Sequence, residues 1–131
     1  MSDEHVAIVR RLVDAINADD LPRDLIAPDF ELRNATTAVT DATYFGYEGA
    51  LKWRRDFFDV IDDGHFVVDE ILASGHDYVM IANRVVGRGS TSGAPVELRW
   101  ASILWFRDGR LSRGAGFESR RESLEAVGAG E

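Results

Sequence analysis

Carboxylates are the side chains in this sequence that could do chemistry, but few are spaced to act together. Asp69 and Glu70 are neighbours in an apolar stretch. Adjacent side chains of a strand point to opposite faces, so these two acids cannot form a dyad. Glu70 alone is a candidate for an inward-facing general base. Asp59, Asp62 and Asp63 cluster near the end of a predicted helix, where we expect them to face solvent.

Histidine, cysteine and glycine patterns predict no metal or cofactor site. His5, His65 and His76 have no partners at metal-ligand spacing, and only His65 is kept, as a distant general-base candidate. The absence of cysteine excludes disulfides, thiolate nucleophiles and zinc–sulfur sites. The segment from Gly87 to Gly93 lacks the Gly-Lys-Ser/Thr ending of a phosphate-binding loop and leads into no predicted helix. We therefore expect no metal and no cofactor.

The composition predicts one globular domain over residues 1–131. At 45% hydrophobic and 29% charged, the chain is too apolar for a disordered protein. Its net charge of −8 disfavours nucleic acid and anionic membranes as partners. The first residues carry no apolar signal core, and no apolar run approaches the roughly 18 residues of a membrane span. We expect a cytoplasmic protein, and the bias to arginine over lysine indicates a GC-rich bacterial genome.

Helical periodicity dominates the first half of the chain. Val6, Val9, Val13 and Ile16 recur at helical spacing and predict a helix over residues 4–18. A short second helix is predicted over 21–26 and a third over 48–62, with a strand over 30–33 and a loop over 35–46 between them.

The period changes to two after residue 64. Strands are predicted over 65–73, 77–87, 95–107 and 110–118, and Asp108–Gly109 is the strongest hairpin signal. Ser119 and Glu122 match a capping box, which predicts a short last helix to about Val127. This order indicates an α+β fold in which a curved antiparallel sheet wraps around three N-terminal helices. Such a sheet is not completely filled by three helices, and the gap is a predicted pocket.

Four short motifs in this order carry a family resemblance. They are Asn17–Asp20, Ala27–Phe30, Gly46–Gly49 and Phe106–Gly109. Over residues 4–127 the chain resembles the SnoaL-like branch of the NTF2-like superfamily, which implies a cystatin-like cone. The superfamily includes ketosteroid isomerases, polyketide cyclases, epoxide hydrolases, dehydratases and non-catalytic transport or scaffold proteins, so the resemblance does not select a function.

The catalytic residues of two of these classes are not found at the matching positions. The oxyanion-hole tyrosine, general-base aspartate and second acid of ketosteroid isomerases fall on Leu12, Asn34 and Ser102. Leucine has no donor, an amide cannot take a proton at neutral pH, and serine donates a hydrogen bond less strongly than a carboxylic acid. The Asp–Arg–Asp relay of epoxide hydrolases is not visible around Arg84 or Arg99. SnoaL-type cyclases use an acid on the last strand, and Glu118 is the carboxylate available there.

Strand alternation predicts which side chains face the pocket. If Ser102 faces inward, then Trp100, Leu104 and Phe106 do so too, with Gly114, Gly116 and Glu118 beside them. Either Asn83 or Arg84 faces inward, not both. An inward Arg84 favours an acidic ligand, and an outward Arg84 pairs with Glu97 across the strands. The predicted pocket residues are Asn34, Tyr44, Trp53, Phe57, Arg84, Trp100, Ser102 and Leu104.

The opposite sheet face carries Ile103 and Trp105, which are unfavourable on a solvated surface. A homodimer that packs sheet to sheet would cover them, and the resemblance implies the same partner.

Two functions remain open. The first is the binding of a small hydrophobic or aromatic ligand, with cofactor-free acid–base catalysis of an isomerase, cyclase or hydrolase type by Glu118 or Glu70. The second is a non-catalytic dimeric scaffold whose interior is filled by side chains.

Overall fold

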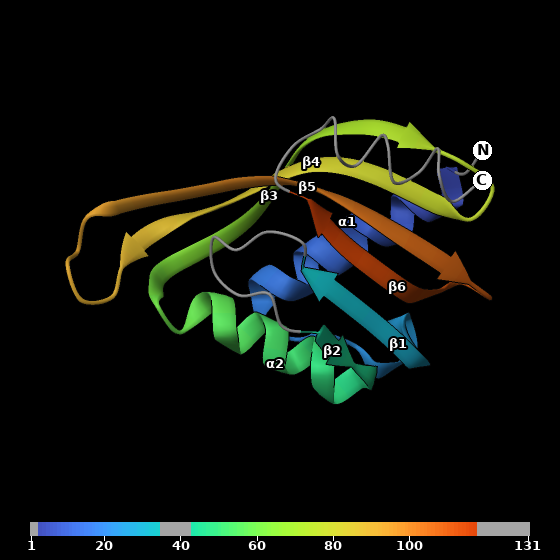
Figure 1. The fold of residues 1–131 in the computed structure, drawn as a ribbon, viewed down its shortest axis with the longest axis horizontal. Helices are drawn as coiled ribbons and strands as arrows, with labels where there is room; N and C mark the ends of the chain where they lie inside the picture. Colours follow the sequence, from blue (N-terminus) through green and yellow to red (C-terminus); the bar gives the residue numbers. More distant parts are fainter. Residues whose placement is uncertain (1–2, 35–42, 118–131) are drawn as a thin grey trace.

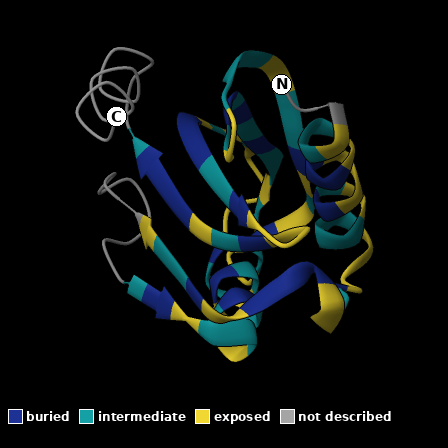
Figure 2. Ribbon diagram, turned by 90° about the vertical axis from the view of Figure 1, so that its right-hand side faces the viewer, coloured by how far each residue is buried: buried dark blue, intermediate teal, exposed yellow. Residues whose placement is uncertain are grey.

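A curved six-stranded sheet holds two α-helices on its concave side (Figures 1 and 2). The computed structural model describes residues 3–34 and 43–117. The strand order is β2-β1-β6-β5-β4-β3, and neighbours are antiparallel except for the parallel pair β1 and β6. The elements are α1 (Asp3–Ala18), the 3₁₀ helix η1 (Arg23–Leu25), β1 (Ile26–Asn34), β2 (Thr43–Phe45), α2 (Gly46–Phe58), β3 (Ile61–Ser74), β4 (Tyr78–Gly89), β5 (Pro95–Arg107) and β6 (Arg110–Phe117).

The α+β architecture is confirmed, but the prediction of three N-terminal helices is wrong. The second predicted helix is only the single 3₁₀ turn η1, and β1 already begins at Ile26. Pro22 lies in extended backbone and disfavours helical backbone at Leu21 before it, so the helix does not begin at Leu21. The pairing of β1 with β6 is irregular between Ile26 and Glu31, which accommodates Pro28 without a backbone donor.

Two further element boundaries differ from the prediction. Residues 43–45 of the predicted loop form β2, which pairs with β1. Helix α2 ends at Phe58 rather than at residue 62, and β3 begins at Ile61. Asp63 and Gly64 have residue types that favour a turn after the helix, but they lie in a bulge of β3 where Asp63 has a φ of 55°.

The hairpins of the second half are confirmed. β5 spans Pro95–Arg107 as predicted, and the turn to β6 is built by Asp108 and Gly109 with φ of 55° and 77°. Two successive positive φ values are those of a type I′ turn, which matches the twist of the strands. The predicted last helix lies outside the described residues.

The core lies between the two helices and the concave face of the sheet. Val9 and Leu12 of α1 and Trp53 and Phe57 of α2 are buried there, on one face of each helix. Phe57 packs between Trp53 and Trp100, with ring centroids 5.0 Å and 5.3 Å away. None of the described helices is both long and apolar enough to cross a membrane.

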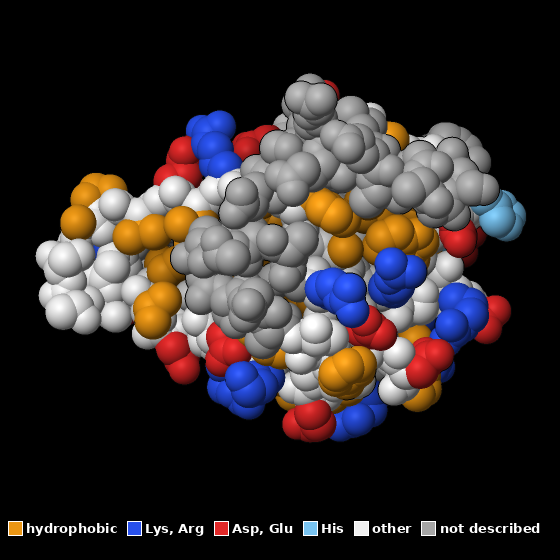
Figure 3. Space-filling model, viewed as in Figure 1, with side chains coloured by type: hydrophobic (Ala, Val, Ile, Leu, Met, Phe, Trp, Pro, Cys, Tyr) orange, Lys and Arg blue, Asp and Glu red, His pale blue; other side chains and the backbone are white. Residues whose placement is uncertain are grey.

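The outer surface of α2 and the convex face of the sheet differ in polarity. Charged side chains of both signs are interspersed over α2 (Figure 3), where Lys52 pairs with Asp56 at 2.9 Å. On the convex face of the sheet, Met80 and Ile103 are paired across β4 and β5 and both are 0% exposed within the single chain. The expectation that Ile103 lies on a solvated face is therefore wrong.

Candidate ligand cavity

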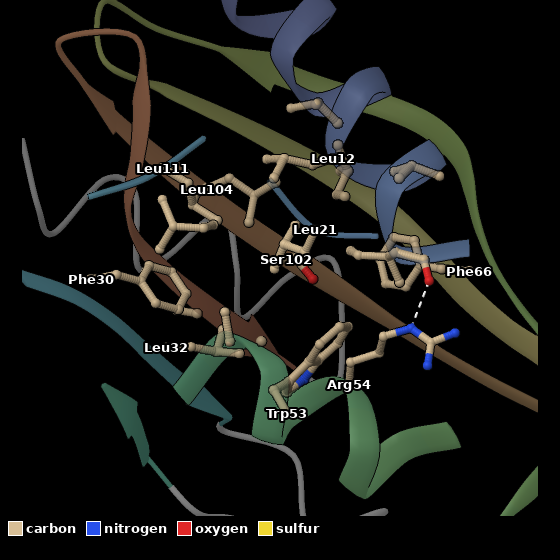
Figure 4. Close-up of a pocket in the computed structure, with 18 of the residues that line it drawn as sticks. Leu12, Leu21, Phe30, Leu32, Trp53, Arg54, Phe66, Ser102, Leu104 and Leu111 are labelled. Atoms are coloured by element: carbon tan, nitrogen blue, oxygen red, sulfur yellow. Dashed lines mark hydrogen bonds between the residues drawn. The ribbon is translucent and has the colours of Figure 1, made fainter. Parts of the chain in front are cut away.

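A cavity of about 90 Å³ lies between α1, α2 and the concave face of the sheet. Figure 4 shows apolar side chains converging on it from both helices and from β1, β3, β5 and β6. Of the described residues, those that line it are Val9, Leu12, Val13, Ile16, Leu21, Ile26, Phe30, Leu32, Ala50, Trp53, Arg54, Phe66, Ile81, Trp100, Ser102, Leu104, Leu111, Ala115 and Gly116.

Small residues leave this space open. Gly114 and Gly116 of β6 and Ala50 of α2 carry little or no side chain on this side of the molecule. A Cβ atom added at Gly114 would come within 2.9 Å of Leu32 Cδ1 and 3.6 Å of Leu104 Cδ2, two side chains that line the cavity. The cavity therefore depends on these small residues opposite the large rings of Trp53 and Trp100.

One polar group enters this apolar lining. The Ser102 hydroxyl projects among the apolar side chains in Figure 4 and donates a hydrogen bond of 2.7 Å to Oδ1 of Asn83. Asn83 is only 1% exposed and Ser102 is also buried. The concave face of the central strands therefore carries a hydroxyl–amide pair at the cavity wall.

Arg54 is the one ionisable residue among the described residues of the lining. Its Nε donates to the carbonyl of Ile16 at 2.7 Å (dashed in Figure 4), and its guanidinium lies 3.3 Å from Oδ1 of Asp19. The guanidinium also lies over the Phe58 ring, 4.6 Å from its centroid. Arg54 thus closes the C-terminal end of α1 and is held away from the cavity centre by three partners. The sequence reasoning missed it, because no local pattern links residue 54 to residues 16 and 19.

Four of the predicted pocket residues line this cavity: Trp53, Trp100, Ser102 and Leu104. Phe57 packs behind the two tryptophans and is not part of the lining. Phe106, expected on the same wall, stacks on His5 with ring centroids 4.9 Å apart, beyond a register shift that follows Trp105. The backbone of Asn34 pairs with Gly116.

The structure places Asn83 inward and Arg84 outward. Arg84 Nε donates to Oδ1 of Asp69 at 2.9 Å, and its Nη1 donates to Oε1 of Glu97 at 3.2 Å. The hydrogen bond that Arg84 donates to Asp69 is the largest cause that raises the pKa of Arg84. The inclusion of Arg84 in the pocket is therefore corrected, and its alternative pairing with Glu97 is found. The alternation of side chains along β4 alone did not decide whether Asn83 or Arg84 faces inward. A bulge in β3 determines which acids reach the outer face beside Arg84.

Tyr44 is buried but faces a different partner. Its hydroxyl donates to Oδ2 of Asp56 at 2.7 Å, and Lys52 donates to the same oxygen at 2.9 Å. The hydrogen bond from Tyr44, followed by that from Lys52, lowers the pKa of Asp56. Tyr44 is not among the residues that line the cavity.

The two predicted bases have different positions. Glu70 is exposed and pairs in register with Ala82, whose neighbour across β5 is Ala101. It borders a shallow depression with Asp69, Arg99 and Ala101 instead of the apolar cavity. Glu118 lies outside the described residues. Within residues 3–34 and 43–117, no group of three or more His, Asp or Glu side chains is arranged to hold a metal ion.

The SnoaL-like domain family matches residues 9–114, which is most of the chain. The chain belongs to this family. A search of curated proteins gave no match. The fold and the sequence pattern therefore agree on a SnoaL-like protein with an NTF2-like, ketosteroid isomerase-like architecture.

Solved structures with the same fold differ in what they bind. A ketosteroid isomerase-like protein from Catenulispora acidiphila, in complex with trimethylamine, is 21% identical with a TM-score of 0.69, over 92% of each chain. A protein from Jannaschia sp. CCS1, provisionally named a SnoaL-like polyketide cyclase, is 22% identical with a TM-score of 0.71, over 96% of this chain and 92% of that one. TerC, crystallised with polyporic acid, is 15% identical with a TM-score of 0.71, over 96% and 99%. At these identities the likeness shows the fold alone.

Proposed function

We propose that this SnoaL-like protein binds a small, flat, mostly apolar molecule in the cavity between α1, α2 and the sheet. The observation that carries the proposal is the space of about 90 Å³, walled by Trp53 and Trp100 and by aliphatic side chains. Interiors normally pack without such spaces, since an empty volume costs stability. A retained cavity with an apolar wall favours burial of an apolar ligand.

The volume limits the size of the ligand. Sites that enclose drug-sized molecules span about 300–1,000 Å³. The present cavity is smaller, and of the same order as the apolar cavity of about 150 Å³ that takes a single benzene ring. The trimethylamine complex of the Catenulispora protein supports a ligand of few atoms in this fold, and the polyporic acid complex of TerC supports a larger one.

Acid–base catalysis is the more specific form of the proposal. An isomerase, cyclase or hydrolase needs a group that accepts a proton inside the cavity. Of the described lining residues, only Arg54 is ionisable, and a guanidinium stays protonated in proteins. Glu118 is then the remaining candidate base, whereas the exposed position of Glu70 gives no support to that role. Ligand binding is therefore the function that the described residues support best.

Titration with α-methylstyrene, a flat molecule with one ring, tests the binding proposal. We expect saturable binding by calorimetry, and chemical shift changes in the NMR spectrum at the indole N–H groups of Trp53 and Trp100. The variant Ala50→Leu places three more carbon atoms into the cavity wall and should abolish binding. Ala7→Leu makes the same change on the exposed face of α1 and should leave binding intact. Absence of binding to the wild type, or equal binding to Ala50→Leu, would contradict the proposal.

A homodimer through the outer sheet face and a cytoplasmic location complete the proposal. Burial of Ile103 within one chain leaves Trp105, covered on one side by Arg113 at 4.3 Å, as an aromatic side chain available to a partner there. Light scattering at micromolar protein should give twice the chain mass of 14.6 kDa. A monomer mass would remove the dimer and leave the ligand proposal unaffected.

A further inference from the structure

Ser102 brings a hydroxyl group to the wall of the apolar cavity. It lines the cavity from the middle of β5, and its oxygen projects among the surrounding apolar side chains in Figure 4. A serine hydroxyl has one proton to donate and two lone pairs that accept. The proton is donated to Oδ1 of Asn83 at 2.7 Å. The hydroxyl therefore meets a ligand as an acceptor, because its single proton is already used.

The surroundings of Ser102 hold this arrangement in place. Asn83 is only 1% exposed, so water does not compete for its Oδ1. Ser102 lies in register between Ile81 of β4 and Gly116 of β6, so its backbone belongs to the interior of the sheet. A hydroxyl that donates one hydrogen bond becomes a stronger acceptor for a second. A chain of hydrogen bonds from a ligand through Ser102 to Asn83 would therefore strengthen at each step.

The rest of the wall restricts the charge of the ligand. Within residues 3–34 and 43–117, no carboxylate lines the cavity, and the positive guanidinium of Arg54 is paired with Ile16 and Asp19. A cationic ligand would be buried without a counterion and near a like charge, which is costly. An anionic oxygen would have no proton to give to Ser102 and would face the lone pairs of the hydroxyl. A neutral ligand avoids both costs.

We infer that the cavity takes a neutral ligand that donates a hydrogen bond to Ser102 Oγ. The inference rests on the proposed binding function and adds the ligand class: a molecule with an apolar body and one O–H or N–H group, such as a phenol in its protonated form. The apolar wall holds the body, and Ser102 fixes the direction in which the donor group points.

Phenol and toluene test the inference on the wild type, because a hydroxyl and a methyl group on the same ring have nearly the same size. A phenol hydroxyl buried without a partner loses its hydrogen bonds to water, which would weaken binding by about a hundred-fold or more. With Ser102 as the acceptor, phenol should bind within about ten-fold of toluene in calorimetry. A larger deficit would overturn the inference and leave the proposed function standing.

The variant Ser102→Ala removes the acceptor. The affinity for phenol relative to toluene should fall about ten-fold, the effect of one buried hydrogen bond. The variant also takes the partner of Asn83 Oδ1 away, but this change acts on both probes and cancels in their ratio. The comparison of phenol with toluene on the wild type does not depend on the folding of the variant.

A second pair of probes checks the direction of the hydrogen bond. Acetophenone and α-methylstyrene differ only in that a carbonyl oxygen replaces a methylene group, and a carbonyl cannot donate. Their affinity ratio should be the same in the wild type and in Ser102→Ala. A fall in the relative affinity for acetophenone, or an unchanged ratio of phenol to toluene, would overturn the inference. Failure of the wild type to bind any of the four probes would overturn the proposed function as well.

Discussion

At the scale of single residues, Tyr44 was a predicted pocket residue, but its hydroxyl forms a hydrogen bond with Asp56 instead. Its hydroxyl is 2.7 Å from Oδ2 of Asp56, and this hydrogen bond is the largest cause that holds the pKa of Asp56 below its ordinary value. A carboxyl whose pKa is lower in the folded state stabilises the fold above its unfolded pKa. That contribution is lost as the pH falls through the folded pKa.

Tyr44→Phe should therefore destabilise the protein in a pH-dependent way. We expect a lower free energy of unfolding at pH 7, and a difference from the wild type that shrinks as the pH falls below about 4. Denaturation by urea at several pH values measures it. Tyr47→Phe is the matched control, because the Tyr47 hydroxyl donates to the carbonyl of Leu21, which does not titrate. A constant difference for Tyr44→Phe at all pH values would contradict the role of Asp56.

The sequence alone placed some single residues in the site and left others undecided. Alternation along β5 predicted that Trp100, Ser102 and Leu104 share one wall, and all three line the cavity, because that part of the strand pairs without interruption. It could not decide between Asn83 and Arg84, since the acids that pair with Arg84 come from two other strands. Nor did it place Glu118, and the role of that residue as a base stays a prediction.

At the scale of elements, the side chain of Asn17 joins α1 to the free edge of the sheet. β3 is the last strand in the sheet order, so no strand of the described residues lies along its outer edge. Asn17 Oδ1 accepts from the backbone N–H of Phe66 at 2.7 Å, and Asn17 Nδ2 donates to the carbonyl of Phe66 at 3.0 Å. One side chain thus satisfies both backbone groups of an edge residue, as a further strand would do.

Asn17→Ala should destabilise the protein by about 2 kcal/mol, since it removes two hydrogen bonds and leaves two partly buried backbone groups unpaired. Chemical denaturation gives the free energy, and hydrogen exchange should show a faster amide at Phe66. Asp14→Ala, on the exposed side of the same helix, should have little effect. Equal effects of the two substitutions would rule out the link between α1 and β3.

Element boundaries were predictable where the local signal and the sheet agree. The Asp108–Gly109 hairpin and the bounds of β5 follow from turn chemistry and alternation. Asp63–Gly64 carries the same kind of signal but lies in a bulge inside β3, because pairing with β4 continues on both sides of it. The place of β1, parallel to β6, depends on contacts between segments about 80 residues apart. Local periodicity has no information on such pairing.

At the scale of the whole molecule, the α+β class and the curved sheet followed from the order of elements, but the size of the interior space did not. That space depends on which side chains face one another. Ala50, Gly114 and Gly116 leave volume that Trp53 and Trp100 do not fill. At about 24 cal/mol per Å³, an empty cavity of about 90 Å³ costs about 2 kcal/mol. The free protein is therefore less stable than it would be with the cavity filled. A ligand or a larger side chain that fills the cavity should raise the free energy of unfolding.

Ala50→Leu should recover part of that stability. The added carbon atoms enter the cavity from the buried face of α2, and we expect the free energy of unfolding to rise by about 1 kcal/mol. Urea denaturation measures the change, and Ala7→Leu should stay within about 0.5 kcal/mol of the wild type. A loss of more than about 1 kcal/mol for Ala50→Leu would indicate overpacking and a cavity too small for the added atoms. A rise in stability together with loss of α-methylstyrene binding would show that the added leucine atoms and the ligand occupy the same cavity, because this volume cannot hold both.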